Sequence, residues 1–320
     1  MKYLITGGCG FIGSHLTDIL LEKNHSVEIL DDLSTGTIEN IKGYLDSPRF
    51  SLWIDTILNY PLLTTLVQNS DFIFHLAAGV GVKTVMENPL STLETNVEGT
   101  RNVLALATRY HKPVLLASTS EVYGKNIHIP FSEEADIVLG PTTKKRWGYA
   151  CSKALDEFLA LAYRETHGLN VIIARLFNTV GPRQRETYGM VIPRFITQAL
   201  QNRPITVFGD GSQTRCFIHC KDVVAALIAL TEKKEAMGEI FNIGSHEEIS
   251  IKKLAQLIIR LTESDSPIEY ISPTTLYAKG FEDMQKRVPD TTKIEKLIGF
   301  SPHYTIERII KETIAYFQTQ

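Results

Sequence analysis

The chain has 320 residues, with 33 lysines and arginines against 36 aspartates and glutamates, so its formal net charge is −3. This length suits two domains rather than one. Hydrophobic residues make up 43% and charged residues 22%, which is ordinary globular composition and excludes a disordered or fibrous protein. The near balance of charge gives no basic surface for nucleic acid or for an anionic membrane.

Two further classes of protein are excluded by the N-terminal segment and the cysteines. Tyr3–Thr17 carries no Asp, Glu, Lys or Arg, but four glycines interrupt it and it is shorter than the roughly 20 apolar residues of a spanning helix. It also lacks a signal-peptide cleavage site. Four cysteines without regular spacing indicate reduced thiols in a cytoplasmic protein, and no second Cys/His pair accompanies Cys216 and Cys220, so no metal site is expected.

The N-terminal half alternates between short apolar runs and amphipathic stretches. The predicted strands cover residues 2–6, 27–30, 50–53, 72–76, 114–117 and 171–176, and the clearest predicted helices cover 11–22, 88–110 and 149–167. Apolar runs without alternation are typical of strands that are buried on both faces, and their alternation with helices indicates a parallel sheet. The prediction is an α/β domain with a doubly wound parallel sheet of the Rossmann type.

After residue 180 the pattern becomes irregular. Short strands are predicted at 205–208, 216–219, 240–243 and 268–271, and helices at 192–201, 222–231, 251–261 and 306–317. We therefore predict a dinucleotide-binding domain over 1–180, with return segments near 216–245, and a smaller α+β substrate domain over 181–320. The cleft between the two domains is the expected ligand site.

A glycine-rich turn separates the first predicted strand from the first helix. Gly7 suits a backbone shape that other residues avoid, Gly10 lets the chain approach a pyrophosphate, and Gly13 lets the helix pack closely on the strand. The N-terminus of that helix offers unpaired N–H groups to an anion. The turn thus predicts a dinucleotide site.

Acidic residues after the next two strands complete that prediction. Asp31 ends the second strand, where a carboxylate can bind the adenosine ribose hydroxyls, and Asp32 beside it would repel a 2′-phosphate. NAD is therefore favoured over NADP. Asp55, after the third strand, either meets the adenine amino group or simply caps the strand end.

Tyr149 and Lys153 form a Tyr-x-x-x-Lys pair at the start of a predicted helix. The spacing of four places the phenol and the ammonium on one helix face. A cation next to a tyrosine favours the phenolate, so Tyr149 is a candidate base for a sugar hydroxyl. Thr119, at the carboxyl end of the fifth strand, is expected beside the pair, where such folds place their chemistry.

These residues belong to a longer series of motifs. The motifs are Thr6–His15, Asn96–Thr100, Thr119–Gly124, Tyr149-x-x-x-Lys153, Arg175–Arg183 and Gly209–Arg215. In this order they resemble the extended short-chain dehydrogenase/reductases that modify nucleotide sugars. The resemblance implies an NAD that oxidises the sugar at C4, a C-terminal domain that grips the nucleotide, and a homodimer built from a four-helix contact.

The resemblance also assigns roles to individual residues. The catalytic residues that it implies are Thr119, Ser120, Glu121, Tyr149, Lys153 and Arg287. The cofactor contacts are Gly7, Gly10, Phe11, Ile12, Gly13, Asp31, Asp32, Asp55, Leu76, Ala77, Ala78 and Asn96, together with Tyr149 and Lys153. The substrate contacts are Asn178, Arg183, Arg215 and Arg287.

Two features favour one branch of this family, the UDP-glucuronate decarboxylases. Glu121 stands where plain 4-epimerases usually carry a small residue, and the segments 146–153 and 277–290 are similar to those of the decarboxylases and related UDP-apiose/UDP-xylose synthases. Arg287 is expected to clamp the sugar carboxylate before it leaves as carbon dioxide. Thr119 and Tyr149 are expected to hydrogen-bond the C4 oxygen. UDP-xylose or a 4-keto sugar would be the product.

Three alternatives stay open at this point. The segment 77–83 is closer to that of the epimerases, which keeps UDP-hexose or UDP-uronate 4-epimerisation as the second choice. A 4,6-dehydratase shares Glu121, but the acidic pair at 31 and 32 argues against the NADP that the GDP-mannose enzyme generally uses. A cofactor-sensing scaffold without activity is opposed by the intact Thr119, Tyr149 and Lys153. Arg287 and Glu121 are also candidates for a purely structural ion pair.

Overall fold

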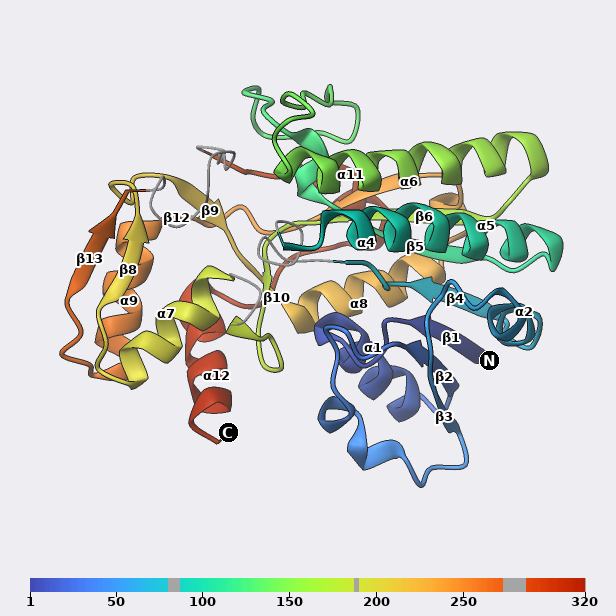
Figure 1. Cartoon of the computed structure of the whole chain (residues 1–320), viewed down its shortest axis with the longest axis horizontal. Helices are drawn as coiled ribbons and strands as arrows, with labels where there is room; N and C mark the ends of the chain where they lie inside the picture. The colour runs from blue at the N-terminus through green and yellow to red at the C-terminus, as the bar shows by residue number, and fades with distance from the viewer. Residues whose placement is uncertain (80–86, 187–189, 273–285, 320) are drawn as a thin grey trace.

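The computed structural model describes residues 1–79, 87–186, 190–272 and 286–319. A parallel seven-stranded sheet forms its larger part (Figure 1), in the order β11-β6-β5-β4-β1-β2-β3. Its strands are β1 (Lys2–Thr6), β2 (Ser26–Asp31), β3 (Phe50–Ile54), β4 (Phe72–His75), β5 (Val114–Thr119), β6 (Val171–Leu176) and β11 (Ile240–Ile243). The prediction of a doubly wound α/β fold is confirmed, because the strand order reverses beside β1.

Helices cover both faces of the sheet. One face is covered by α1 (Phe11–Glu22), α8 (Cys220–Thr231) and α11 (Thr292–Ile298). The other is covered by α2 (Tyr60–Gln68), α5 (Thr100–Arg109) and α6 (Arg146–His167). Each layer buries its own apolar cluster, and burial of this kind contributes roughly 25 cal/mol per Å² of apolar surface. The central strands are buried on both sides, as their apolar runs predict.

Two elements of this domain differ from the prediction. The predicted helix 88–110 consists of α4 (Pro89–Glu94) and α5, joined by a π-helical turn over Thr95–Gly99. Strand β3 is not buried on both faces, since Trp53 and Ile54 are 42% and 58% exposed. Strand β3 forms one edge of the sheet, beside β2.

The smaller part of the molecule is built on short strand pairs. It contains β7 (Thr179–Val180), β8 (Ile205–Phe208), β9 (Thr214–Cys216), β10 (Ile218–His219), β12 (Glu248–Ser250) and β13 (Ile268–Ile271). Its helices are α7 (Val191–Leu200), α9 (Ile251–Thr262) and α12 (Ile306–Gln318). These helices share one apolar cluster with β8 and β13, which pair in parallel. This is the α+β arrangement that the irregular pattern predicts.

The predicted strand 216–219 is split in two. Its first part, in β9, pairs antiparallel with β12, whereas Ile218 and His219 in β10 pair in parallel with β7. One apolar run therefore serves two different partners, and a sequence pattern that reports only local extension does not separate them.

The chain crosses between the two parts several times. Segments α8 and β11, inside the predicted return region 216–245, join the helical layer and the sheet of the first domain. Helix α11 also packs into that first layer through Ile294, so a second return occurs beyond the predicted region.

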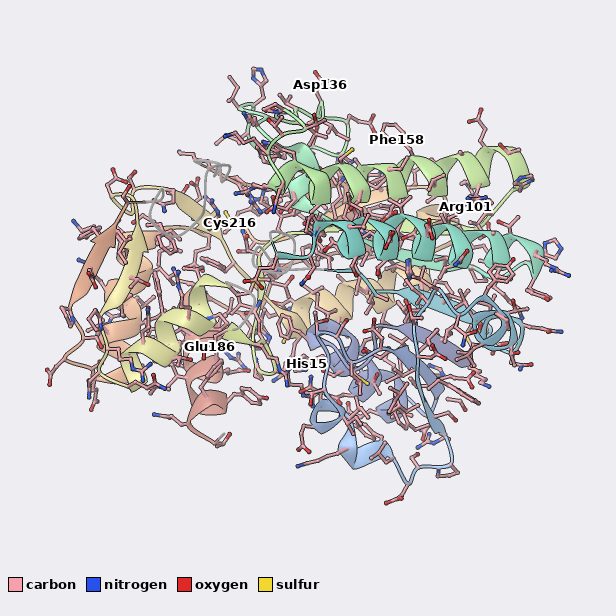
Figure 2. All side chains as sticks on the ribbon, in the orientation of Figure 1. His15, Arg101, Asp136, Phe158, Glu186 and Cys216 are labelled. Atoms are coloured by element: carbon pink, nitrogen blue, oxygen red, sulfur yellow. The ribbon has the colours of Figure 1, made fainter. Side chains whose placement is uncertain are left out.

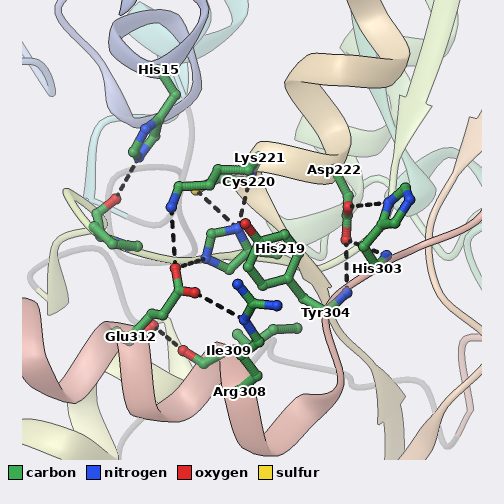
Figure 3. Close-up of polar contacts among 12 residues, drawn as sticks. His15, His219, Cys220, Lys221, Asp222, His303, Tyr304, Arg308, Ile309 and Glu312 are labelled. Carbon is green, nitrogen blue, oxygen red and sulfur yellow. Dashed lines mark hydrogen bonds and ion pairs between the residues drawn. The ribbon is translucent and has the colours of Figure 1, made fainter.

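A polar junction fastens α12 to the start of α8 (Figure 3). The buried His219 ring stacks on Tyr304 at 4.1 Å between centroids, and its Nε2 lies 3.5 Å from Oε2 of Glu312. On α8, Asp222 accepts hydrogen bonds from the backbone N–H groups of His303 and Tyr304. These contacts hold the second core against the first.

Candidate active site

A cavity of about 1010 Å³ lies along the carboxyl ends of the parallel strands. On one side it is lined by the residues that end or follow β1, β2, β4, β5 and β6, and on the other by residues from α7, β8, β9 and the start of α9. It therefore lies between the two parts of the molecule, as predicted. In an open parallel sheet this edge is the place where ligands bind.

The glycine-rich turn forms a cradle at one end of the cavity. Gly7 has a φ of +74°, and a Cβ there would stand 2.8 Å from the Ala77 nitrogen. A Cβ on Gly13 would stand 2.7 Å from the Cα of Gly8. Gly10 is the N-cap of α1 and has no side chain to occupy the first N–H groups of the helix. The cradle fits a pyrophosphate held by backbone amides.

The acidic pair lies beside this cradle. Asp31 ends β2 and its two carboxylate oxygens accept N–H groups from Cys9 and Leu33, each at 2.8 Å. Burial raises the pKa of this carboxyl, while the two backbone hydrogen bonds and the charge of Asp32 act on it more weakly. Both aspartates line the cavity, so an acidic edge is placed where a ribose would bind.

The remaining predicted cofactor contacts divide into two groups. Phe11, Ile12, Asp55, Leu76, Ala77 and Ala78 all line the cavity. The Asp55 carboxylate also accepts from the Thr56 backbone N–H and the Asn59 side chain, each at 2.7 Å, so it caps the strand end as well. Asn96 lies outside the lining. It is fully buried and bridges the backbone N–H of Gly79 to the Ser152 hydroxyl, because a buried amide needs both partners.

The predicted proton-transfer residues meet at the centre of the cavity. Thr119 is the last residue of β5, and Tyr149 and Lys153 lie on consecutive turns at the start of α6. All three line the cavity, with Ser120 beside them. The Thr119 hydroxyl hydrogen-bonds the Tyr149 phenol and also accepts the Glu121 N–H at 3.2 Å. A hydroxyl that is bound between Thr119 and Tyr149 would face both groups.

The charge next to Tyr149 differs from the prediction. Burial raises the pKa of Tyr149 above its ordinary range, and the carboxylates of Glu121 and Asp156 raise it further, against smaller lowering effects of Thr119 and Arg287. The expected stabilisation of the phenolate by Lys153 is therefore not the main influence on the pKa of Tyr149. The reason is that Nζ of Lys153 is paired with Oδ2 of Asp156 at 2.9 Å, where both side chains are buried.

Glu121 is held between two guanidinium groups. Its Oε1 lies 2.5 Å from Nη2 of Arg287, and its Oε2 lies 3.0 Å from Nη2 of Arg146. Burial alone would raise the pKa of Glu121, but the two arginines overcome it and hold the pKa at about 2. Glu121 is thus a permanent carboxylate. The structure shows the ion pair between Glu121 and Arg287 that was one of the two sequence interpretations, and both residues also line the cavity.

Besides Arg287, two of the other three predicted substrate contacts line the cavity. Asn178 and Arg215 line the cavity; the Asn178 amide donates to the Cys216 carbonyl at 2.9 Å. Arg183 does not line it. Its Nη1 lies 2.8 Å from Oδ2 of Asp18 on α1, because a positive φ of 70° at Arg183 carries the chain toward the first domain.

Several lining residues were missed by the sequence analysis. Arg194 of α7 lies over the Phe208 ring, 4.5 Å from its centroid, and both residues line the cavity near Arg215. Arg146 stands one helical turn before Tyr149, so the helix period could have placed it on the same face. Asp156 does not line the cavity but pairs with Lys153, which does; it follows Lys153 by three residues and could have been found in the same way. Arg194 gave no such local signal, because only the packing of α7 brings it to the cavity.

The sequence of residues 4–313 matches the family model described as GDP-mannose 4,6 dehydratase. The chain belongs to this family of extended short-chain dehydrogenase/reductases. The family prediction from the motifs is therefore confirmed over nearly the whole chain, and the chain is an enzyme of the class that modifies nucleotide sugars.

Relatives named as decarboxylases are similar over almost the whole of this chain. The chain is 46% identical to a UDP-N-acetyl-alpha-D-glucosaminuronate decarboxylase of Bacillus cytotoxicus, covering 99% of this chain and 98% of that one. It is 36% identical to UDP-glucuronic acid decarboxylase 1 of Xenopus tropicalis, covering 100% and 72%. Among solved structures, UDP-glucuronic acid 4-epimerase of Bacillus cereus, in complex with UDP-glucuronic acid and NAD, superposes with a TM-score of 0.90 at 28% identity, covering 100% and 99%.

Neither a membrane-crossing helix nor a cluster of metal ligands is present among the described residues. None of the helices within residues 1–79, 87–186, 190–272 and 286–319 is both long enough and apolar enough to cross a membrane. Over the same ranges, no three His, Cys, Asp or Glu side chains gather in a way that could hold a metal ion.

Proposed function

We propose that the protein is an NAD-dependent UDP-glucuronate decarboxylase that acts through oxidation at C4 of the sugar. The relatives at 46% and 36% identity are decarboxylases of UDP-linked uronic acids, and they match this chain from end to end. The charges of the cavity support the same substrate class. The lining residues of the substrate half include Arg146, Arg194, Arg215 and Arg287 against the single acid Glu121. A diphosphate and a carboxylate would complement this excess of positive charge.

NAD fits the other half of the cavity. The glycine cradle and the N-terminus of α1 would hold the pyrophosphate, and the acidic pair at the end of β2 would meet a ribose without a 2′-phosphate. When it is bound, NAD accepts a hydride from C4 of the sugar. Residues 76–78 and Lys153 also line the cavity and belong to this half.

The residues of β5 and α6 supply the proton chemistry. Once ionised, against the raised pKa that burial, Glu121 and Asp156 give its phenol, Tyr149 would take the proton from the C4 hydroxyl, and the Thr119 hydroxyl would hydrogen-bond the same oxygen. Oxidation makes C4 a ketone, so the C5 carboxylate lies β to a carbonyl and its C–C bond can break with release of carbon dioxide. The electron pair moves to the C4 oxygen, where Thr119 and Tyr149 stabilise the developing charge.

Arg287 carries the assignment to uronic acids. One arm of its guanidinium pairs with Glu121, while its buried Nε has no hydrogen-bond acceptor among the described residues. A buried donor of this kind is costly unless an acceptor occupies the site, and a sugar carboxylate would provide one. Glu121 keeps the guanidinium in place. Its low pKa means that it carries no proton to deliver, so we assign it a positioning role rather than the proton relay at C5.

The decisive experiment is a product analysis. Purified protein is incubated with UDP-glucuronate and, separately, with UDP-N-acetylglucosaminuronate, and the products are followed by NMR together with measurement of carbon dioxide. Decarboxylation of UDP-glucuronate supports the proposal. A clear preference for the N-acetylated sugar would show that the substrate carries an N-acetyl group at C2 in place of a hydroxyl. Absence of turnover of both sugars rejects the uronate assignment.

A UDP-uronate 4-epimerase is the second candidate. One observation favours it: the UDP-glucuronic acid 4-epimerase of Bacillus cereus has the same fold with a TM-score of 0.90. An epimerase returns the hydride to the opposite face of C4, and the carboxylate stays on the sugar. The same NMR experiment separates the two, because UDP-galacturonate without gas release identifies the epimerase.

We also propose that the enzyme is a homodimer that pairs through α5 and α6. Cys151, Leu155, Phe158 and Ala162 are all exposed and follow the i, i+4, i+7, i+11 spacing of one helix face. Leu155 and Phe158 are 43% and 63% exposed. Figure 2 shows Phe158 on the outer side of α6, with the neighbouring α5 marked by Arg101. A second copy placed on this stripe would bury it and form the four-helix contact that the family resemblance implies.

A cytoplasmic location is part of the same proposal. All four cysteines are free thiols, and three of them are buried. A reducing compartment keeps such thiols in that form.

A further inference from the structure

A chain of buried polar side chains runs from Lys153 into the interior, away from the cavity. Lys153 and Asp156 lie one turn apart on α6, and their ion pair of 2.9 Å is almost completely buried, with side chains 3% and 0% exposed. An ion pair this deeply buried calls for an explanation, because desolvation of the two charges costs free energy that their attraction only partly returns.

The far side of Asp156 is supported by residues from three other elements. The Thr100 hydroxyl at the start of α5 faces the carboxylate and is also 3.0 Å from Nε2 of His75, at the end of β4. Nδ1 of the same ring is 2.7 Å from Oγ1 of Thr6, which ends β1. Burial lowers the pKa of His75 to about 3, so the ring is a neutral hydrogen-bonding link. The position of Asp156 is therefore fixed by the central strands.

We propose that Asp156 is the positioning residue of the proton-transfer pair: its carboxylate fixes the Lys153 ammonium beside the cavity and balances the positive charge that Tyr149 experiences. Asp156 does not line the cavity, so it would touch neither a bound sugar nor a bound cofactor. It acts through its ion pair with Lys153 and through the electrostatic field of its own charge. The inference rests on the proposed function only in taking Tyr149 as the proton acceptor.

The direction of the effect follows from the charged groups around the phenol. Burial, Glu121 of the turn after β5 and Asp156 of α6 raise the pKa of Tyr149, whereas Thr119 and Arg287 lower it. Burial is the main effect on Asp156 and raises the pKa of its carboxyl, as the neighbouring Glu157 also does, whereas Lys153 and Thr100 oppose that rise by stabilising the carboxylate. Removing the charge of Asp156 should therefore leave Lys153 free to favour the phenolate.

The test is a titration of Tyr149 in the holoenzyme. The chain has 12 tyrosines, so tyrosinate absorbance is measured for each protein and for the same protein carrying Tyr149→Phe, and the difference is taken. In Asp156→Asn the midpoint of the difference should fall by about one pH unit or more, and the acidic limb of the kcat profile should move in the same direction. Asp156→Glu, which keeps the charge, should stay close to the wild type.

A matched control and a second background keep the test decisive. Asp222→Asn removes another buried carboxylate, in the junction and outside the cavity lining, and should leave the midpoint unchanged. If Asp156→Asn does not fold, Lys153→Met is compared with the Lys153→Met/Asp156→Asn double variant, in which the pair is replaced by neutral groups; the midpoint should again be lower without the carboxylate. An unchanged midpoint in the folded variants overturns the proposal and leaves Asp156 with a structural role. The titration needs no sugar, so its result is independent of which sugar the enzyme accepts.

Discussion

Nη2 of Arg287 lies 2.5 Å from Oε1 of Glu121, although the two residues are far apart in the chain. The contact ties a segment that follows the last strand of the small domain to the turn after β5. It places a guanidinium beside the groups that we propose for the proton chemistry, and the charges of both residues act on Tyr149.

Loss of the Tyr149 phenol should remove the base. Tyr149→Phe keeps the ring that packs on α6 but has no oxygen to accept the C4 proton, so kcat should fall by about 10²–10⁴-fold with the unfolding midpoint unchanged. Steady-state kinetics and circular dichroism check this. Tyr163→Phe, on the same helix and outside the cavity lining, is the control. Activity near that of the wild type in Tyr149→Phe would exclude it from the mechanism.

Arg287→Ala should affect sugars with a carboxylate selectively. The variant loses the buried Nε and Nη donors, so kcat/KM for UDP-glucuronate should fall by about 10²-fold or more, as expected for loss of a charged hydrogen-bonding partner. Any oxidation of neutral UDP-hexoses should be largely spared. Arg183→Ala is the matched control, because Arg183 pairs with Asp18 outside the cavity. Equal losses on both sugars would show that Arg287 is only structural.

The apolar stripe on α6 should control the oligomeric state. Leu155→Glu combined with Phe158→Glu places two charges on the stripe and should convert a dimer into a monomer, as measured by light scattering after gel filtration. The exposed Cys151 lies on the same face and should become faster to alkylate in that variant. Ile127→Glu changes an equally apolar residue, 82% exposed, elsewhere on the surface and should stay dimeric. A monomeric wild-type protein would contradict the proposal.

Glu157 should be a stability residue rather than a catalytic one. Its carboxylate pairs with Arg175 at 2.7 Å and accepts from Ser118, joining α6 to β5 and β6 in the interior. Glu157→Ala leaves the Arg175 guanidinium buried without its partner, so the free energy of unfolding should fall by about 3–5 kcal/mol in denaturant titration. Lys311→Ala, which removes an exposed ion pair with Glu307, should change stability little. A similarly small effect of both substitutions would contradict this assignment.

His219 should contribute to acid unfolding. Burial lowers its pKa from 6.5 to about 4, so below pH 6.5 the unfolded chain takes up a proton that the folded ring does not bind until about pH 4. Stability from the neutral ring is present above pH 6.5 and is lost as the pH falls toward 4.

The variant His219→Asn tests this directly, because Asn retains a side-chain acceptor for the N-cap of α8. It loses the stacking on Tyr304, so its Tm should be lower at pH 8, and the difference from the wild type should shrink as the pH falls to about 4. His128→Asn, at an exposed position, should follow the wild-type curve. A Tm difference that stays constant over this range would show that the ring does not titrate as described.

The sequence by itself determined the sheet, the dinucleotide cradle and the Tyr149/Lys153 pair. Each of these rests on a pattern that is local in the chain: uninterrupted apolar runs for buried strands, glycines where a Cβ would collide, and a spacing of four on one helix face. Motifs such as these depend on residues that fold next to one another, so spacing alone is enough to reveal them.

Only the tertiary structure decided the ionisation states of the site residues and the contacts of residues that are distant in sequence. It showed that Lys153 is paired with Asp156, that Glu121 is held ionised between Arg146 and Arg287, and that Arg183 turns to the first domain. A side chain's partner and burial depend on elements that are distant in sequence, and an ionisation state depends on both. That is the physical reason why the sequence could name candidate reacting groups while the fold decided which of them carry charge, and where.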